Sequence, residues 1–350
     1  MQIKEFRNDE FVNREEEIKY LKKWFKSTPK EILWLYGPKS TGKTTLIEYV
    51  IEKELTSDLK IFSKYWIKYI NFRGLMIGGY DSFINSFFEE SEDGDDFEDE
   101  VKSGFNLGVI KLETKTLQKI KERKKNLFNE LIEKLKRVNK TKILVIDEIQ
   151  TLQDLYFNGE KEFLKEFLNF CVRLTKETHL AHVVILSSNT IFIDQIYNDA
   201  KLKVTSEFKK IDHLDKETIF EYLEYKGIKD KELIWDYLGG CIPLVQRFIR
   251  DVEYYGNTLE YLSYVVKLAK NEIIDLTDKN FDDQEYKMFE NIIFKIVNQN
   301  GFILPKRTKK EIYEIIDFMA QKEIFFYNPL ERKVTGNNRL YEKAFEELIN

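Results

Sequence analysis

The stretch GPKSTGKTT, residues 37–45, follows the apolar run ILWLY (32–36) and precedes LIEYVIEKEL (46–55). A strand, then G-x-x-x-x-G-K-[ST], then a helix is the context in which backbone N–H groups and a helix N-terminus converge on one phosphate. A surface turn that merely contains glycine and lysine is the alternative, and the apolar run before the glycines weighs against it. The stretch therefore predicts a P-loop.

The positions of this loop have separate physical roles. Gly37 and Gly42 allow the backbone to approach phosphates where a Cβ would clash, and Lys43 reaches the β- and γ-phosphate oxygens. Thr44 is expected to place its hydroxyl on Mg²⁺. The residues expected to surround the nucleotide phosphates are Gly37, Pro38, Lys39, Ser40, Thr41, Gly42, Lys43, Thr44 and Thr45.

KILVIDEIQ, residues 142–150, is the second anchor of the prediction. Its continuous apolar run is typical of a central parallel strand that is covered on both faces. Asp147 and Glu148 follow at the carboxyl end of that strand, where open α/β sheets bind ligands. Asp147 is expected to hold Mg²⁺, and Glu148 to act as general base on the attacking water. Two acids in a plain turn are the alternative, which the upstream P-loop disfavours.

A third apolar run, HVVILSSNT at 182–190, ends in the small polar residues Ser187, Ser188 and Asn189. Such side chains at a strand end can sense the γ-phosphate or position the water. Ser188 and Asn189 are our catalytic candidates, although spacing alone does not decide among the three.

Composition limits the class of protein. With 350 residues the chain exceeds one typical core, which predicts two or three domains. The net charge of -5 argues against a bulk polyanion binder but allows local basic patches. Cys171 and Cys241 stand alone, so neither zinc nor a disulfide framework is expected. No apolar run reaches the ~18 residues of a membrane span, and we expect a cytoplasmic protein without a membrane partner.

Further segments complete the pattern of strands and helices. Residues 62–72 and 205–214 are expected to be strands, and 111–138 a long amphipathic helix. Asn13 is expected to cap a helix that ends near residue 25. The acidic stretch 91–100 is expected to be a solvated surface loop. Strands alternating with helices predict an α/β fold, a doubly wound parallel sheet of the P-loop NTPase type.

Beyond Asp215 the period is helical, with a break at Gly239 and Gly240 before Pro243. A helical lid over the nucleotide and a simple helix–helix corner fit this spacing equally well. From residue 281, helices precede two strands around Asn328 and Pro329, which suggests a C-terminal winged helix. The expected domains are 1–214 (ATPase), 215–278 (lid) and 279–350 (winged helix).

The C-terminal segment carries cations that could neutralise DNA phosphates. Neighbouring acids leave the segment close to neutral, so a protein-facing or intramolecular role stays open. The candidates before or at the expected recognition helix and on the expected wing are Lys306, Arg307, Lys309, Lys310, Arg332, Lys333 and Arg339.

These motifs together resemble a known family, the archaeal P-loop ATPases of the AAA-related STAND class, which are similar in architecture to origin-recognition initiator ATPases. FVNREEE (11–17) resembles the N-terminal box of that family, and GPKSTGKTT its Walker A motif. ILVIDEIQ (143–150) resembles its Walker B motif and HVVILSSNT its sensor strand. LGGCIPL (238–244) is similar to its glycine-proline lid motif.

The resemblance implies further site residues. Val12, Asn13 and Arg14 become candidates for contact with the adenine base, and Pro243 becomes part of a nucleotide lid. One departure concerns the rate of hydrolysis. The family often has an arginine just before the strand that leads into the lid, whereas VTSEFKKI (204–211) has none. Because an arginine finger is worth roughly 10³–10⁵ in rate, we expect slow hydrolysis.

The sequence thus predicts an ATP- and Mg²⁺-binding, slowly hydrolysing ATPase. Our first hypothesis is a nucleotide-driven regulatory switch that acts on a protein partner or through self-association. The rival is an ATP-controlled DNA-binding initiator or mobile-element helper that uses its winged helix. A loader or remodelling motor is a third option.

Overall fold

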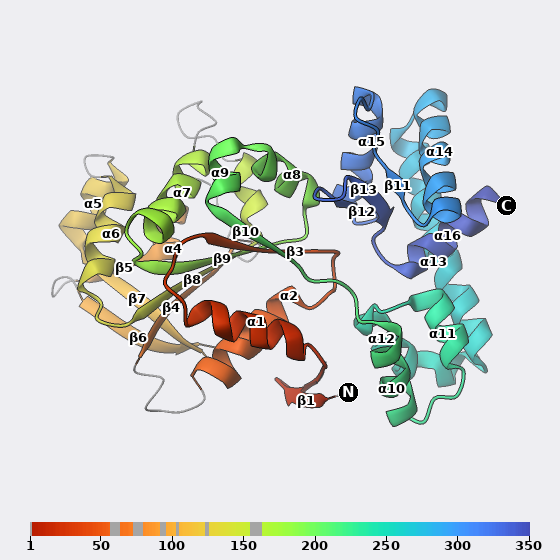
Figure 1. Cartoon of the computed structure of the whole chain (residues 1–350), viewed down its shortest axis with the longest axis horizontal. Coiled ribbons are helices and arrows are strands. Elements are labelled where there is room, and N and C mark those ends of the chain that lie inside the picture. Colours follow the sequence, from red (N-terminus) through yellow and green to blue (C-terminus); the bar gives the residue numbers. More distant parts are fainter. Residues whose placement is uncertain are drawn as a thin grey trace.

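The computed structural model describes residues 2–56, 64–72, 80–91, 96–102, 105–122, 126–154 and 163–350. Its centre is a parallel sheet with the strand order β10-β3-β9-β8-β4 (Figure 1). The strands are β3 (Ile32–Tyr36), β4 (Tyr65–Asn71), β8 (Thr141–Asp147), β9 (Ala181–Ser187) and β10 (Ser206–Lys210). The predicted α/β class with a parallel sheet is confirmed.

Helices cover both faces of this sheet, which explains the continuously apolar strands. Leu33 and Leu35 pack into one core with α1 (Glu15–Phe25), α2 (Lys43–Tyr49) and η1 (Val50–Leu55). Trp34, between them on β3, points to the other core. The helices that contribute to this second core include α4 (Tyr80–Phe87), α5 (Thr114–Lys121), α6 (Leu127–Arg137), α7 (Phe163–Val172) and α8 (Thr190–Asn198). Successive side chains of a strand alternate between faces, so each face needs its own apolar layer.

The carboxyl edge of the sheet collects the predicted motifs. The P-loop follows β3, Asp147 ends β8 and Ser187 ends β9. Because β9 lies between β3 and β8, all three strand ends are neighbours. The short elements that complete this part of the chain are η2 (Ile149–Asp154), η3 (Arg173–Glu177) and α9 (Ala200–Val204).

One expectation for the middle of the chain was wrong and a second was only partly right; residues 92–95 and 123–125 of these two segments lie outside the described residues. The acidic stretch is not a loop throughout, because β6 (Asp96–Lys102) pairs antiparallel with β7 (Phe105–Glu113), and β5 (Phe88–Ser91) pairs parallel with β7. Pairing with β7 satisfies backbone groups that a charged segment would otherwise leave to water. The expected long helix is divided between the end of β7, α5 and α6. Asn126 begins α6 by accepting a hydrogen bond from the Asn129 amide.

An N-terminal hairpin packs on the helices that follow the sheet. β1 (Ile3–Phe6) and β2 (Asp9–Val12) are antiparallel. Val12 shares a core with Ile219 and Phe248 of the following helices. These helices are α10 (Lys216–Tyr225), α11 (Lys231–Leu238), α12 (Ile242–Asp251) and η4 (Val252–Tyr255). The predicted break between α11 and α12 therefore exists, with Pro243 in the first turn of α12.

The C-terminal part begins with α13 (Thr258–Asn280), which contributes Leu262 to the core of α10–α12 and Ile273 to the C-terminal core. It continues as α14 (Asp283–Gln299), β11 (Phe302–Ile303), α15 (Lys310–Gln321), β12 (Phe325–Asn328), β13 (Lys333–Gly336) and α16 (Arg339–Ile349). The three strands form an antiparallel sheet with the order β11-β13-β12. The predicted strands around Asn328 and Pro329 and the final helix are confirmed.

Figure 1 shows the parallel sheet and its helices on one side of the molecule and α10–α16 on the other. Because α13 packs in two cores, the domain boundaries at residues 214 and 278 remain predictions. In the described part of the chain, no helix has the length and apolar character needed to cross a membrane.

Candidate nucleotide-binding site

Two glycines shape the P-loop for different reasons. Gly37 has φ +154°, and a Cβ there would lie 2.0 Å from the carbonyl oxygen of Ile211, so backbone proximity requires glycine. A Cβ at Gly42 would meet no atom within 4 Å, but φ is +79° at this N-cap of α2. Left-handed backbone disfavours any residue with a Cβ. The chain therefore turns sharply into α2, and the first amides of that helix point into the loop.

Lys43 lies inside the loop. Its ammonium is buried and donates to the carbonyl oxygens of Gly37 at 2.9 Å and Pro38 at 2.7 Å. Burial lowers the pKa of Lys43 to about 8, against the opposing effect of the Asp147 and Glu148 carboxylates. A cation held by carbonyls in a dry loop is a strong partner for phosphate oxygens, because little water has to be displaced from it.

Thr44 and Asp147 are in direct contact. The Thr44 hydroxyl donates to Oδ2 of Asp147 at 2.8 Å, and the Tyr69 hydroxyl donates to the same oxygen at 3.1 Å. Asp147 is 5% exposed. Two hydroxyls thus hold one buried carboxylate oxygen beside the N-terminus of α2.

Glu148 is joined to the end of β9 through Gln150. The Gln150 side-chain amide donates to Oε2 of Glu148, and its carbonyl oxygen accepts from the Ser187 hydroxyl at 3.2 Å. Glu148 itself has φ +58°, a left-handed conformation. The chain of contacts Ser187–Gln150–Glu148 fixes the carboxylate at the carboxyl edge of the sheet.

The other two residues of the sensor strand differ in their surroundings. Oδ1 of Asn189 accepts a hydrogen bond from the Phe192 amide at 2.9 Å and so caps the start of α8. Ser188 is partly exposed beside it. Of the three residues Ser187, Ser188 and Asn189, the described contacts connect Ser187 to Glu148; the catalytic roles of Ser188 and Asn189 remain predictions.

Residues 12–14 contact both the P-loop and helices α10–α12. Arg14 is buried and donates to the carbonyl oxygens of Thr41 at 2.8 Å and Asp212 at 2.6 Å. Asn13 does not cap α1 as expected: Arg14 occupies that position with φ +75°, and the Asn13 amide donates to the Thr218 hydroxyl at 2.8 Å. Val12 packs among helices α10–α12. These residues contact the P-loop and α10, and their contact with the adenine base stays a prediction.

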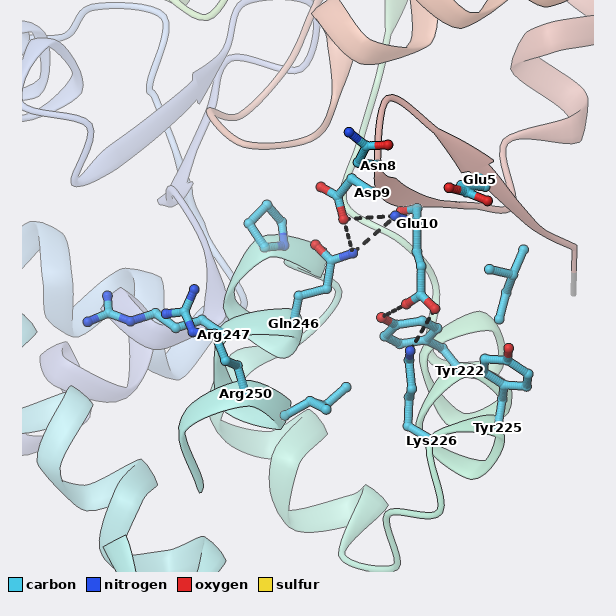
Figure 2. A pocket seen from close by; sticks show the side chains of 13 residues that line it. Glu5, Asn8, Asp9, Glu10, Tyr222, Tyr225, Lys226, Gln246, Arg247 and Arg250 are labelled. Carbon is cyan, nitrogen blue, oxygen red and sulfur yellow. Dashed lines mark hydrogen bonds and ion pairs between the residues drawn. The ribbon is translucent and has the colours of Figure 1, made fainter. Parts of the chain in front are cut away.

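A cavity of about 1150 Å³ lies between the N-terminal hairpin and helices α10 and α12 (Figure 2). Pro243 is one of its lining residues. Glu10 points into it and accepts hydrogen bonds from the Tyr222 hydroxyl and the Lys226 ammonium, both at 2.6 Å. No residue of the P-loop lines this cavity. A second cavity of about 350 Å³ is lined by Pro38, by Gly239 and Gly240, and by Asn337 of the C-terminal part. Pro243 and the P-loop therefore line different cavities.

The C-terminal part contacts the P-loop directly. The Lys39 amide donates to Oδ1 of Asn337 at 3.1 Å, and the Lys39 ammonium pairs with Glu323. The Asn337 carbonyl lies 2.9 Å from Nε2 of His213. At the outer side of the loop, Ser40 and Thr45 are exposed.

The chain has relatives among known proteins. The model of the ATPase domain found predominantly in Archaea matches residues 11–248. The chain belongs to this family. Two relatives of this chain, both uncharacterized ATP-binding proteins of Methanocaldococcus jannaschii, are 32% identical over 347 residues and 33% identical over 358 residues. The first alignment covers 97% of each chain, and the second 97% of this chain and 99% of the relative. Among solved structures, the Aeropyrum pernix ORC2 protein in its ADPNP–ADP complexes has a TM-score of 0.49 at 11% identity, covering 99% of this chain and 95% of its own.

A magnesium ion fits the residues of this site. The described residues contain no group of three or more His, Cys, Asp or Glu side chains that could hold a metal. Mg²⁺ is commonly bound by one or two protein oxygens together with phosphate oxygens and water. The Thr44 hydroxyl and the Asp147 carboxylate supply that kind of donor set.

Several side chains that contact the site were not predicted from the sequence. Tyr69 lies in the expected strand 62–72, and Gln150 lies in the segment that resembles a Walker B motif. The spacing of a tyrosine or a glutamine in such a segment does not indicate a contact with the site. Glu323 and Asn337 are far from every motif. The strand register, which sets Asn71 opposite Asp147, could have suggested Tyr69 only once the sheet order was known.

Proposed function

We propose that this chain binds ATP with Mg²⁺, hydrolyses it slowly, and uses the nucleotide state as a regulatory switch. The contact between Thr44 and Asp147 carries the proposal. It holds a hydroxyl and a carboxylate, two donors of the kind that Mg²⁺ binds, side by side before any ligand is present. Membership of an ATPase family supports the choice of ATP.

Different residues of the chain have different roles in the proposed hydrolysis. Lys43 and the amides at the start of α2 bind and orient the phosphates, where the low-dielectric loop strengthens their effect. Glu148 would take a proton from the attacking water as general base. Gln150 would orient the Glu148 carboxylate. Mg²⁺, when bound to Thr44 and Asp147, would neutralise charge that develops on the phosphates.

We expect slow turnover from segment 204–211 and from the surroundings of Arg14, which belong to the part of the chain that the structure describes. The segment 204–211 contains no arginine. The guanidinium of Arg14 is close to the P-loop but already donates to two carbonyl oxygens and to Glu17. A partner or second copy that supplies an arginine would therefore accelerate hydrolysis.

The contact between the C-terminal part and the P-loop supports the proposed regulatory switch. Lys39 bonds Asn337 and Glu323, so a change in the P-loop on nucleotide binding acts on both. Phosphate binding at Lys43 competes with the carbonyls of Gly37 and Pro38, which are next to Lys39.

Nucleotide binding tests the first part of the proposal. Charge-assisted hydrogen bonds are worth roughly 1.5–3 kcal/mol, so Lys43→Ala should weaken ATP binding by about one to two orders of magnitude. Exposed Lys30 provides the matched control, and Lys30→Ala should keep the affinity. Unchanged affinity in Lys43→Ala, measured by fluorescence titration with a labelled ATP analogue, would refute the assignment.

Hydrolysis is tested by steady-state ATP turnover across a series of protein concentrations, with and without duplex DNA, beside Glu148→Gln. Turnover per chain that rises with concentration or DNA and disappears in the variant would indicate a composite ATPase. Tight binding with negligible turnover throughout would indicate a switch that requires a separate activator.

The second candidate is an ATP-controlled DNA-binding initiator or mobile-element helper. The order α14-β11-α15-β12-β13 supports a winged helix in which α15 is the recognition helix. Lys306, Arg307, Lys309 and Lys310 are exposed at its start. Arg339 is not on the wing as expected, because it begins α16 and pairs with Asp236. A salt-dependent DNA shift that disappears when these four cations are neutralised would favour this candidate.

A further inference from the structure

A second concentration of positive charge lies at the opposite edge of the parallel sheet from the P-loop. It is formed by the lysines in the second half of α1 and by residues at the start of β4 and β8. Two cavities of about 610 Å³ and about 720 Å³ lie along it and share Lys26 and Ser27. Glu15 and Glu54 also line the smaller cavity, where they pair with Lys4 and Lys22. The lysines that line the two cavities, which we call the basic face, include Lys19, Lys22, Lys23, Lys26, Lys64 and Lys142.

The lysines of α1 follow a helical spacing. Lys19, Lys23 and Lys26 are exposed at positions i, i+4 and i+7, so they share one side of the helix. In the described ranges, none of the three has a carboxylate within ion-pair distance, whereas Lys22 pairs with Glu54 at 2.5 Å. Lysines near a helix C-terminus gain a little from its dipole. That gain does not account for the cations that other elements add to the same face.

The larger cavity brings those cations in. Lys64 precedes β4, Lys142 lies at the start of β8, and no carboxylate is among the described lining residues. Burial lowers the pKa of Lys142, and no acidic neighbour opposes that effect. Nδ1 of His182, a residue only 1% exposed in the same lining, has no hydrogen-bond partner. Among the described residues, this cavity is therefore rich in donors and has no carboxylate in its lining.

We propose that the basic face binds the phosphodiester backbone of a nucleic acid. The length of the face favours an extended polyanion over a small one: Lys19 to Lys26 span seven residues, about 10 Å of helix, and the cavity that contains Lys64 and Lys142 continues beyond Lys26. Lysines act as point charges on phosphates and carry no base preference. The binding is therefore independent of sequence, and it differs from the candidate winged helix in place and in chemistry.

Distance from the P-loop separates this inference from the proposed ATPase function. The strands between the two edges are seven residues long in β4 and β8, about 20 Å. Substitutions on the basic face should therefore leave nucleotide binding and folding unchanged. Loss of ATP binding in Lys43→Ala tests one proposal, and loss of DNA binding with normal ATP binding tests the other.

The test is fluorescence anisotropy of a labelled 20-base-pair duplex with the full chain, from about 50 to 250 mM KCl. The combined variant Lys19→Ala, Lys23→Ala and Lys26→Ala should bind at least about tenfold more weakly. The slope of log K against log salt should also become shallower by about 2 to 3, because each phosphate contact contributes about 0.9. Replacing the same lysines by arginine should preserve the affinity.

A matched control removes equal charge elsewhere. Lys267, Lys279 and Lys287 are exposed on α13 and α14, and their combined change to alanine should leave binding within about twofold. Four outcomes would overturn the proposal. Two are no duplex binding at 50 mM salt and equal losses in the basic-face and control variants. The third is displacement of the duplex by polyglutamate as readily as by unlabelled DNA, which would assign the face to an acidic protein. The fourth is displacement by tripolyphosphate at equal phosphate concentration, which would assign it to free oligophosphate.

Discussion

The Thr44 hydroxyl donates to Oδ2 of Asp147 at 2.8 Å although 103 positions separate the two residues in the chain. Their strands, β3 and β8, are not adjacent, because β9 lies between them. The contact closes the gap because Thr44 belongs to the helix that starts at the carboxyl edge, and Asp147 ends its strand at that edge. The proposed metal site is thus assembled by the fold before any ligand arrives.

Removing the carboxylate charge should separate Mg²⁺ dependence from nucleotide binding. In Asp147→Asn the side chain keeps its shape and can still contact Thr44 and Tyr69, but it no longer attracts a cation. We expect the increase in ATP affinity that Mg²⁺ brings to fall by about tenfold or more, since a charged hydrogen bond contributes roughly 1.5–3 kcal/mol. Affinity in EDTA should change little. Titration of a fluorescent ATP analogue with and without Mg²⁺ measures both, and an unchanged Mg²⁺ effect would contradict the site.

Gln150 is expected to act as a positioning residue for Glu148. Its amide donates to Glu148 and its carbonyl oxygen accepts from Ser187, so Gln150→Ala frees the carboxylate from the sheet edge. A general base contributes about 10²–10⁴ in rate, and loss of its orientation should lower kcat by about tenfold with KM nearly constant. Exposed Gln299 serves as control. A change in KM alone would indicate a structural role instead.

The contact between Asn337 and the P-loop should control nucleotide release. Asn337 is buried, and its side-chain oxygen accepts from the Lys39 amide. In Asn337→Ala that amide loses its partner and the C-terminal part is held less firmly. We expect the dissociation rate of a fluorescent nucleotide, followed by stopped-flow chase with ATP, to rise about three- to tenfold. Asn298→Ala, at an exposed site on α14, should not change the rate; equal rates in both variants would exclude this coupling.

His213 should make stability depend on pH. Burial lowers its pKa, the charges of Arg14 and Lys43 act in the same direction, and Asp212 and the Asn337 carbonyl act against it. A lowered pKa means that protonation disfavours the folded state. The contribution of neutral His213 is therefore complete above its ordinary pKa of about 6.5 and is lost as the pH falls below that value.

The comparison with His213→Gln isolates this contribution, because His182 also has a lowered pKa but is present in both proteins. Between pH 6.5 and 5 the free energy of unfolding should fall faster in the unmodified chain, by up to about 1.4 kcal/mol per pH unit for one proton. Urea unfolding at several pH values measures the difference. Parallel pH curves for the two proteins would show that His213 does not titrate in this way.

Local patterns in the sequence determined the P-loop, the apolar strands and the helices around the Gly239–Gly240 break. These features depend on neighbouring residues: a period of hydrophobicity, a glycine at a sharp turn, an acid after a buried strand. The same reasoning failed at residues 96–100 and 111–113, which belong to strands β6 and β7. There, β7 offered a backbone partner that charge and helical period do not reveal.

The sequence by itself therefore determined the α/β class and the positions of Lys43, Thr44, Asp147 and Glu148 in the chain. Only the tertiary structure decided which side chains surround them. Tyr69, Gln150 and Asn337 reach the site through the strand order and through packing of the C-terminal part on the P-loop. Such contacts between distant segments depend on where whole elements pack, and no local pattern records that.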